Sequence, residues 1–389
     1  MYDVIVVGAG PSGSYIASRL AQLGYRVIVM ERKKEAGEDI CCTGIISVDC
    51  FNTFKLDATI FGQASSAKFF APSGEFIRLE RQNPQAYIVD RATLDRSLKE
   101  RAQKYGAEYL FSALVAALSS EPNQILVTVE SQGKRMEFNA QTVVLACGFS
   151  PDLPRKLGLG GIANFAFGAQ AEVDTNVDEV EVYFDQELFP GFFGWLVPTS
   201  ASKGLAGLLV SQKPAFYLDN FLSCLYNRGK ISSVADERFG MIPLATLPRS
   251  YSDRILIIGD AAGQVKPTTG GGIYYGLLCA DVAADCLHQA FLANDFSAVK
   301  LSLYEKRWRA KLGSDLKTDY RARHFYQNLS NHQIDHLFQL ARDDGIAELV
   351  AEWSDFSFDW HRAIILKMLK GLAFNMPIKS IRTLLEGGD

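Results

Sequence analysis

Three glycines near the N-terminus have the spacing that a bound pyrophosphate requires. Gly8, Gly10 and Gly13 follow an apolar run of strand length at residues 2–7, and a helical apolar pattern begins directly after them. In such a strand, turn and helix, the first glycine permits the tight turn, the second lets the backbone approach a pyrophosphate, and the third allows close helix packing. Glu31 ends the next apolar strand, where it can accept hydrogen bonds from an adenosine ribose. The sequence therefore predicts a dinucleotide site, but FAD and NAD share this fingerprint.

A second glycine-rich segment lies far along the chain. An apolar strand pattern at residues 254–258 ends in Gly259 and Asp260, and three glycines at 270–272 open a long helix of small residues that begins at Ile273. The positive end of that helix dipole would stabilise negative charge on a reduced flavin. This second segment favours FAD over NAD.

Together the two segments resemble the two ends of the flavin site in FAD-dependent enzymes with the para-hydroxybenzoate hydroxylase-like fold. The resemblance implies that Asp260 lies by the ribityl chain and phosphates, and that Gly271, Gly272 and Ile273 face the flavin ring. It also implies the fold class, α/β (α+β): a doubly wound, Rossmann-like FAD-binding domain with an inserted antiparallel-sheet substrate domain and a C-terminal helical region.

Three further stretches resemble motifs of the geranylgeranyl reductase family. Residues 86–95 resemble the segment whose arginine contacts FAD, which assigns that role to Arg91. Residues 41–47 resemble the cysteine-containing loop beside the flavin, and residues 190–198 resemble the Tyr-x-Trp-x-Phe-Pro motif of the substrate pocket. The resemblance covers roughly residues 1–320 and is far less specific beyond them.

Three positions depart from the family's patterns. Phe193 stands for the tyrosine and Val197 for the phenylalanine of the pocket motif, and Cys147 stands where the family often has an acidic residue. Loss of the tyrosine hydroxyl favours a substrate that differs from the one in the family's name. The cofactor contacts that the motifs and the resemblance imply are Gly8, Gly10, Gly13, Glu31, Arg32, Cys42, Thr43, Gly44, Arg91, Val115, Gly148, Asp260, Gly271, Gly272 and Ile273.

Cys42 is the candidate catalytic residue. Saturation of an isoprenoid alkene needs a hydride from flavin N5 and a proton from an acid on the other face of the double bond. Cys42 would donate that proton, shape the cavity over the ring, or be an inert buried thiol; Cys41 is the lesser candidate. Phe193 and Trp195 would line an apolar slot for a hydrocarbon chain or belong to the core of a sheet.

These residues require a flavin domain that is assembled from separated pieces of the chain. Residues 178–185 alternate between apolar and polar, and residues 194–210 read as a hairpin, so an antiparallel sheet is predicted between the pieces. Helical patterns follow. The predicted boundaries are 1–62, 86–160 and 246–292 for the FAD-binding domain, 63–85 and 161–245 for the sheet domain, and 293–389 for the helical region.

Composition and charge exclude several classes of protein. With 40 basic and 44 acidic residues and no basic stripe, the chain is not expected to bind nucleic acid. Seven cysteines without zinc-like spacing favour reduced thiols, and His332 and His336 lack a third ligand, so no metal site is predicted.

The expected compartment is the cytoplasm. Met1 leads directly into the first strand without room for a signal sequence, and no uninterrupted apolar run approaches the ~20 residues that span a bilayer. Residues 361–374 combine an apolar face with two lysines, which is compatible with peripheral contact at a membrane surface, although packing on the core is the commoner fate of such a helix.

The leading hypothesis is an FAD-dependent oxidoreductase that saturates C=C bonds of a prenyl chain on a diphosphate, lipid or quinone. The family resemblance carries this hypothesis. One alternative is a flavin-dependent monooxygenase that hydroxylates or epoxidises an apolar substrate, and another is a flavoprotein with a binding or redox-sensing role only. No second dinucleotide fingerprint is visible, so NADPH in transient contact or a ferredoxin-like protein would deliver the electrons.

Overall fold

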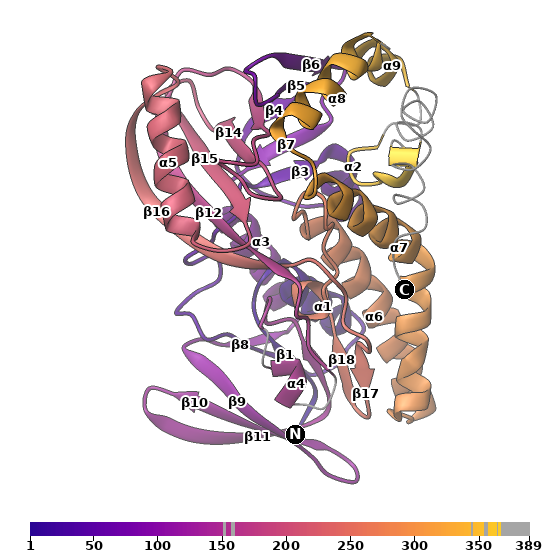
Figure 1. The fold of residues 1–389 in the computed structure, drawn as a ribbon. Helices are drawn as coiled ribbons and strands as arrows, with labels where there is room; N and C mark the ends of the chain where they lie inside the picture. Colours follow the sequence, from indigo (N-terminus) through magenta and orange to yellow (C-terminus); the bar gives the residue numbers. More distant parts are fainter. Residues whose placement is uncertain (151–152, 157–159, 344, 354–356, 364, 367–389) are drawn as a thin grey trace.

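The computed structural model describes residues 1–366 except 151–152, 157–159, 344, 354–356 and 364. In this part of the chain, one sheet of eight strands, one of seven and one of three are combined with helices. Figure 1 shows the eight-stranded sheet with α1 and α6 in the lower half of the molecule, and the seven-stranded sheet with α5 at the upper left. This arrangement confirms the predicted fold class.

Five parallel strands form the middle of the eight-stranded sheet, in the order β18-β11-β1-β2-β8. All four residues of β2 and all three of β18 are buried, as expected for parallel strands covered on both faces. The strands of this sheet are β1 (Tyr2–Val7), β2 (Val27–Met30), β8 (Glu108–Leu110), β9 (Ala113–Ser120), β10 (Ile125–Ser131), β11 (Lys134–Leu145), β17 (Tyr251–Ser252) and β18 (Ile255–Ile257).

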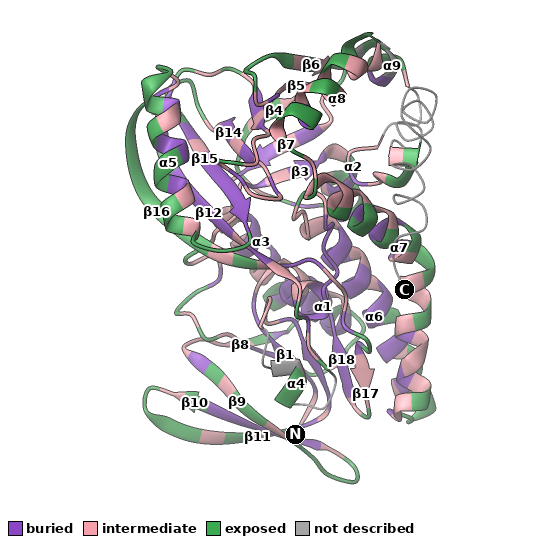
Figure 2. Ribbon diagram, in the orientation of Figure 1, coloured by how far each residue is buried: buried purple, intermediate pink, exposed green. Residues whose placement is uncertain are grey.

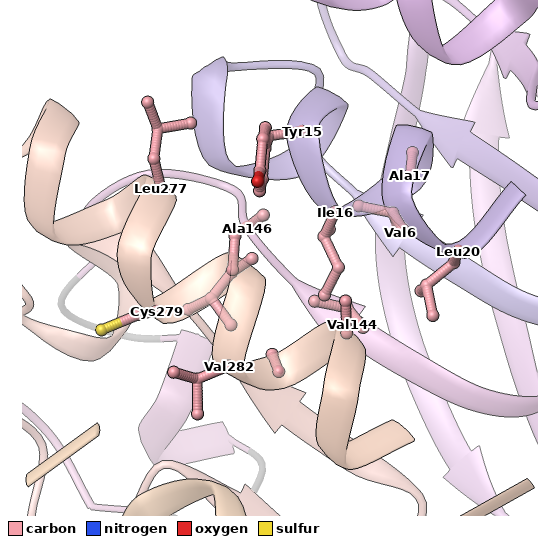
Figure 3. Close-up of a cluster of buried hydrophobic side chains, with 14 of the residues drawn as sticks. Val6, Tyr15, Ile16, Ala17, Leu20, Val144, Ala146, Leu277, Cys279 and Val282 are labelled. Carbon is pink, nitrogen blue, oxygen red and sulfur yellow. The ribbon is translucent and has the colours of Figure 1, made fainter. Parts of the chain in front are cut away.

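Different layers cover the two faces of this sheet. Helices α1 (Pro11–Gln22), α3 (Arg91–Lys104) and α6 (Ile273–Ala293) pack on one face. Figure 3 shows this core, in which Val6 of β1 and Val144 of β11 lie among side chains of α1 and α6. The opposite face packs against β9 and β10 rather than against α-helices. These two strands pair antiparallel with each other, and β10 also pairs antiparallel with β11.

The seven-stranded sheet has the order β16-β12-β15-β14-β13-β5-β6. The predicted hairpin of β14 and β15 is confirmed, but β13 pairs with β5 in parallel, so the sheet is not wholly antiparallel. A parallel pair is possible because the chain returns from β5 to β13 through the first sheet, a much longer connection than a hairpin. Its strands and helix are β5 (Ser66–Phe70), β6 (Phe76–Glu80), β12 (Phe165–Thr175), β13 (Val180–Tyr183), β14 (Gly194–Pro198), β15 (Lys203–Val210), β16 (Ile231–Pro243) and α5 (Pro214–Asn227).

The small third sheet joins the other two. Its order is β3-β7-β4, with β3 (Ile45–Ser47), β4 (Ile60–Ala64) and β7 (Ala86–Val89), and α2 (Val48–Thr53) follows β3. Because β3 ends the cysteine-containing loop and β7 precedes Arg91, this sheet brings those two motifs together.

The C-terminal region is helical, as predicted, and includes α7 (Ala298–Tyr326), α8 (Asn331–Asp343) and α9 (Ile346–Glu352). Its first helix, α7, runs from α6 to the seven-stranded sheet, where the Gln186 amide donates to the carbonyl oxygen of Tyr326 at 3.2 Å. A four-residue helix, α4 (Leu153–Lys156), lies elsewhere in the chain. Most of the segment 361–374, whose pattern is compatible with either membrane contact or packing on the core, lies outside the described residues.

Of the described helices, α6 alone has the length and hydropathy to cross a bilayer. It packs between α1 and α7, and Figure 2 shows it mostly buried, whereas β16 is exposed along most of its length. Length and composition are the only features of α6 that suggest a membrane span, and its burial is that of a core helix.

Candidate functional site

Four strand ends meet at one edge of the eight-stranded sheet. Val7 of β1 is in register with Met30 of β2 and with Leu145 of β11, and Leu145 is in register with Ile257 of β18. The glycine turn, Glu31 and the Gly-Asp turn therefore begin side by side. The carboxyl ends of parallel strands are where sheets of this class bind their ligands.

The glycine turn is closely packed except at one position. A Cβ atom on Gly8, whose φ is +106°, would lie 2.4 Å from the carbonyl oxygen of Ala146, and a Cβ atom on Gly13 would lie 2.0 Å from that of Gly8. At Gly10, by contrast, no heavy atom lies within 4 Å of the Cβ position. The backbone at Gly10 and the N-terminus of α1 thus face open space, which suits a pyrophosphate.

Glu31 supports this turn directly. Its two carboxylate oxygens accept hydrogen bonds from the backbone N–H of Ala9 at 2.8 Å and of Lys33 at 2.9 Å. Each oxygen keeps a second lone pair for a ribose hydroxyl. The backbone N–H of Ala113 donates to the carbonyl oxygen of Glu31, which places the start of β9, and hence Val115, near Glu31. Arg32, the next residue after Glu31, is exposed.

The Gly-Asp turn forms a short 3-10 helix, η1 (Gly259–Ala262), directly after β18. Burial raises the pKa of the Asp260 carboxyl, and the nearby charge of Arg91 opposes that rise. A Cβ atom on Gly272 would lie 2.8 Å from Asp260 Oδ1, so the carboxylate is in van der Waals reach of the glycine run. This places Asp260 beside the start of α6 at Ile273.

Arg91 joins the cysteine-containing loop to α3. Its Nη2 donates to both carboxylate oxygens of Asp95, at 3.1 and 3.3 Å, while its Nε is buried without a partner in the described part of the chain. Burial acts to lower the pKa of Arg91, but Asp95 and the Cys42 thiol outweigh it and hold the pKa above its usual value. Arg91, Asp95, Cys42 and Asp260 therefore form one electrostatic cluster.

This arrangement fits FAD. The open space over Gly10 admits a pyrophosphate, the Arg91 Nε offers a buried donor, and the Asp260 carboxylate offers acceptors for ribityl hydroxyls. Gly44, whose φ is +74°, holds the cysteine-containing loop against β7, since a Cβ there would lie 2.2 Å from the carbonyl oxygen of Val89. Gly148, at φ +71°, has open space around it. The individual contacts with FAD remain predictions.

The structure separates the two neighbouring cysteines. Cys42 lies by Arg91, whereas the Cys41 sulfur lies 3.5 Å from the carbonyl oxygen of Arg238 and 4.0 Å from that of Gly168, on β16 and β12. Thr43 then donates to the amide oxygen of Gln170 on β12 at 3.0 Å. Of the two thiols, Cys42 is therefore the one that belongs to the predicted flavin site.

Burial raises the pKa of both Cys41 and Cys147 to about 11. At pH 8 the reactive thiolate should therefore be about a hundredfold scarcer than for a thiol of pKa 9. We expect iodoacetamide to label these two cysteines about a hundredfold more slowly than a free reference thiol, with the rate rising tenfold per pH unit. Peptide mass spectrometry of quenched samples between pH 7 and 9 measures both rates, and labelling at the reference rate would contradict the burial.

Phe193 and Trp195 belong to an apolar cluster that we call the apolar wall. Its members are Ala166, Phe192, Phe193, Trp195, Leu209, Ile242 and Leu244. The wall reaches the glycine run, since a Cβ on Gly270 would lie 3.1 Å from Ile242 and 3.4 Å from Leu209. The Trp195 ring lies over Gly207, where a Cβ would be 2.5 Å away, and its Nε1 is buried without a partner within the described residues.

The seven-stranded sheet carries this wall on one face only. Leu196, next to Trp195, points to the other face and packs under α5 with Phe221. A shallow hollow lined by Tyr183, Phe221 and Arg228 lies on the α5 side, away from the glycine run, and we assign it no part in the site.

A segment near the C-terminus, residues 357–361, closes over the loop at residues 266–272. The Lys266 ammonium donates to Asp359 Oδ1 at 2.8 Å, with both side chains 5% exposed, and the Ser47 hydroxyl bonds the other carboxylate oxygen. The Tyr275 hydroxyl donates to the Asp359 carbonyl at 3.2 Å, and His361 Nδ1 lies 3.0 Å from the Thr268 hydroxyl. One segment thus ties the cysteine-loop side of the site to the glycine run.

Sequence reasoning did not find Asp95, Gln170 or Asp359. The sequence pattern could have identified Asp95, because it lies four residues after Arg91 in a helical pattern and therefore on the same face of the helix. Gln170 is a buried polar residue in an apolar strand, which is a weaker signal. No local pattern pointed to Asp359, because its partners lie far away in the sequence.

Comparisons with known proteins show which proteins this chain resembles. The family described as lycopene cyclase protein matches residues 3–362. The chain is 31% identical to digeranylgeranylglycerophospholipid reductase 2 of Methanopyrus kandleri over 90% of this chain and 92% of that protein. It is 29% identical to digeranylgeranylglycerophospholipid reductase of Methanocaldococcus jannaschii over 89% and 92%. A geranylgeranyl bacteriochlorophyll reductase-like protein from Thermoplasma acidophilum has the same fold, with a TM-score of 0.86, 22% identity and 98% and 99% coverage.

Proposed function

The chain belongs to the lycopene cyclase protein family and to the family of digeranylgeranylglycerophospholipid reductases, and from this we propose that it is an FAD-dependent reductase that saturates C=C bonds of prenyl chains. The observation that carries the proposal is the contact between the apolar wall and the glycine run at Gly270. A long hydrocarbon chain laid along Phe193 and Trp195 would reach the place where the start of α6 faces the predicted flavin ring.

The protein's own residues would position the reactants. FAD, when bound and reduced, would supply the hydride. Arg91 and Asp260 would hold the cofactor, and the N-terminus of α6 would favour negative charge on the ring. The apolar wall would bind the chain and exclude water, which suits a substrate with no polar group near the double bond.

An anaerobic experiment tests the proposal. The flavin-loaded protein is reduced with dithionite and mixed with geranylgeranyl diphosphate or a geranylgeranylated lipid, and flavin reoxidation is followed together with product mass. We expect reoxidation coupled to a gain of two hydrogens for each double bond. A product of unchanged mass would instead point to ring closure, as the description of the matched family suggests, and oxygen insertion in air would point to a monooxygenase.

Cys42 is the proposed proton donor. We expect Cys42→Ala to slow flavin reoxidation by the prenyl substrate about a hundredfold, the usual size of a general-acid contribution, while FAD content stays unchanged. Cys42→Ser should retain part of the rate. Cys41→Ala is the matched control, because that thiol contacts β12 and β16 instead. Equal rates for Cys42→Ala and Cys41→Ala would leave Cys42 only a role in shaping the cavity.

The electron donor and the cellular setting are part of the same proposal. NADPH in transient contact or a ferredoxin-like protein would reduce the flavin, and the enzyme would act in the cytoplasm at the membrane surface, where long prenyl lipids reside. Reduction of the bound flavin by NADPH alone, measured by its absorbance under nitrogen, distinguishes the two donors.

A further inference from the structure

Three side chains on one face of α7 carry buried polar atoms that lack a partner. Asp319 Oδ1, Arg323 Nε and Tyr326 Oη each make no hydrogen bond within the described part of the chain. Their spacing, i, i+4 and i+7, puts them on one face of the helix, and we call them the polar stripe. Buried polar atoms in folded proteins are nearly always satisfied, so three together indicate a polar ligand.

The polar stripe extends along α7 from the loop at 266–272 to the seven-stranded sheet. At one end, the Thr268 hydroxyl lies 3.3 Å from Asp319 Oδ2. In the middle, the Arg323 guanidinium lies 4.4 Å above the ring of Phe192, a member of the apolar wall. At the other end, the ring of Tyr326 lies 5.6 Å from Phe184. The stripe spans about 10 Å of helix.

Arg323 is a cation whose charge is not balanced by any carboxylate among the described residues. Its Nη1 donates to the neutral amide oxygen of Gln327 at 3.2 Å, and burial lowers its pKa. The other cations near the site differ, because Lys266 pairs with Asp359 and Arg91 with Asp95. A partly buried cation without a counter-ion is costly, and an anionic ligand would remove that cost.

The Tyr326 hydroxyl, about one turn along the helix from Arg323, can donate a hydrogen bond. Burial and the nearby Asp185 carboxylate raise the pKa of Tyr326, but Asp185 already accepts hydrogen bonds from the Asn331 side chain and from the backbone N–H groups of Glu187 and Leu188. Phosphate oxygens accept hydrogen bonds and pair well with guanidinium groups. Asp319 would repel an anion. Thr268 and His361 hold the Asp319 carboxylate one helical turn nearer the loop at 266–272, so an anion would bind at the Arg323 end of the stripe.

We propose that Arg323, with the Tyr326 hydroxyl, binds the phosphate group of an amphipathic isoprenoid substrate whose hydrocarbon chain lies on the apolar wall. This inference rests on the proposed function, which supplies the isoprenoid chain. The phosphate is that of a free prenyl diphosphate or of a phosphorylated lipid head group. A phosphate at Arg323 lies about one helical turn, 6 Å, from the Asp319 end of the stripe, so the chain begins close to the glycine run.

Equilibrium binding to the flavin-loaded protein tests this inference without turnover. Geranylgeranyl diphosphate and the neutral geranylgeraniol are titrated by calorimetry into the wild-type protein, Arg323→Met, Arg323→Lys and Arg321→Met. We expect Arg323→Met to weaken the affinity for the diphosphate about tenfold or more and to change the affinity for geranylgeraniol by less than about twofold, as for loss of a charge-assisted hydrogen bond. Arg323→Lys should lose less of the affinity for the diphosphate. Arg321 is exposed on the same helix, so Arg321→Met is the matched control and should change the affinity for neither ligand.

The outcomes separate this inference from the proposed function. Equal weakening of both ligands by Arg323→Met, or no weakening of either, overturns the phosphate site. If the wild-type protein binds the diphosphate through Arg323 but neither ligand reoxidises reduced flavin, the phosphate site stands and the reductase function fails. Titration with digeranylgeranylglyceryl phosphate and its neutral alcohol identifies the source: a larger Arg323 effect for the lipid pair assigns the site to a lipid head group.

Discussion

Gly10→Ala should fold like the wild-type protein but bind FAD about a hundredfold more weakly. No heavy atom lies within 4 Å of the Cβ position at Gly10, and its φ of −70° suits any residue, so the apoprotein accommodates the methyl group without strain. The same methyl group occupies the space over the turn and would push a pyrophosphate away from the backbone N–H groups. Loss of two charge-assisted hydrogen bonds of about 1.5 kcal/mol each corresponds to the hundredfold effect.

Fluorescence titration of the apoprotein with FAD measures the affinity, and thermal unfolding without FAD measures the fold. Gly62→Ala is the matched control, because Gly62 also has room, with only Ile88 Cδ1 at 3.6 Å, but lies in β4 away from the turn. Gly13→Ala should instead fail to fold, since its Cβ would lie 2.0 Å from a backbone oxygen. Unchanged FAD affinity in Gly10→Ala would refute the placement of the pyrophosphate.

The second large effect is expected at the buried ion pair of Lys266 and Asp359. Lys266→Met removes the cation and leaves the Asp359 carboxylate buried, with the Ser47 hydroxyl as its remaining side-chain partner among the described residues. Leaving such a charge uncompensated costs about 3–5 kcal/mol. We expect the melting temperature to fall by several degrees, and hydrogen exchange at residues 357–361 to accelerate because the segment is released to let the carboxylate reach water.

A double variant identifies the cause of that loss. Lys266→Met combined with Asp359→Asn has no buried charge and keeps the bond to Ser47, so most of the stability should return. Arg342→Met, which breaks an exposed ion pair with Glu75, should leave the melting temperature nearly unchanged. If the double variant is as unstable as Lys266→Met alone, the loss comes from packing around Tyr275 and not from the charge.

The local parts of the site could be predicted because local residues determine them. The turn at Gly8 to Gly13 needs positive φ and close backbone contacts that only glycine permits, so its sequence pattern and its structure coincide. The hairpin of β14 and β15 follows from two apolar runs joined by a short polar loop. Alternation at residues 178–185 predicted the strand β13, but the parallel pairing of β13 with β5 depends on a connection through another sheet.

Contacts between distant segments could not be predicted. Cys41 and Cys42 are neighbours in sequence, yet the loop turns one thiol toward β16 and the other toward Arg91. Nothing local distinguishes them, because the direction of each side chain depends on which sheet packs against the loop. Likewise, residues 1–62 carry no sign that Ser47 will bond to Asp359 near the other end of the chain.

The dinucleotide turn, the Gly-Asp turn, the family and the residue types available for the chemistry can be identified from the amino-acid sequence, since short motifs with fixed backbone geometry encode them. Which charges are balanced depends instead on how distant segments pack. Lys266 and Arg323 are both basic residues that the sequence alone does not tell apart. Folding gives Lys266 a buried carboxylate partner, whereas Arg323 packs against the ring of Phe192 and has no carboxylate partner in the part of the chain that the structure describes. Burial and the distance to a counter-ion are properties of packed segments, and these two properties make Arg323 a candidate ligand site.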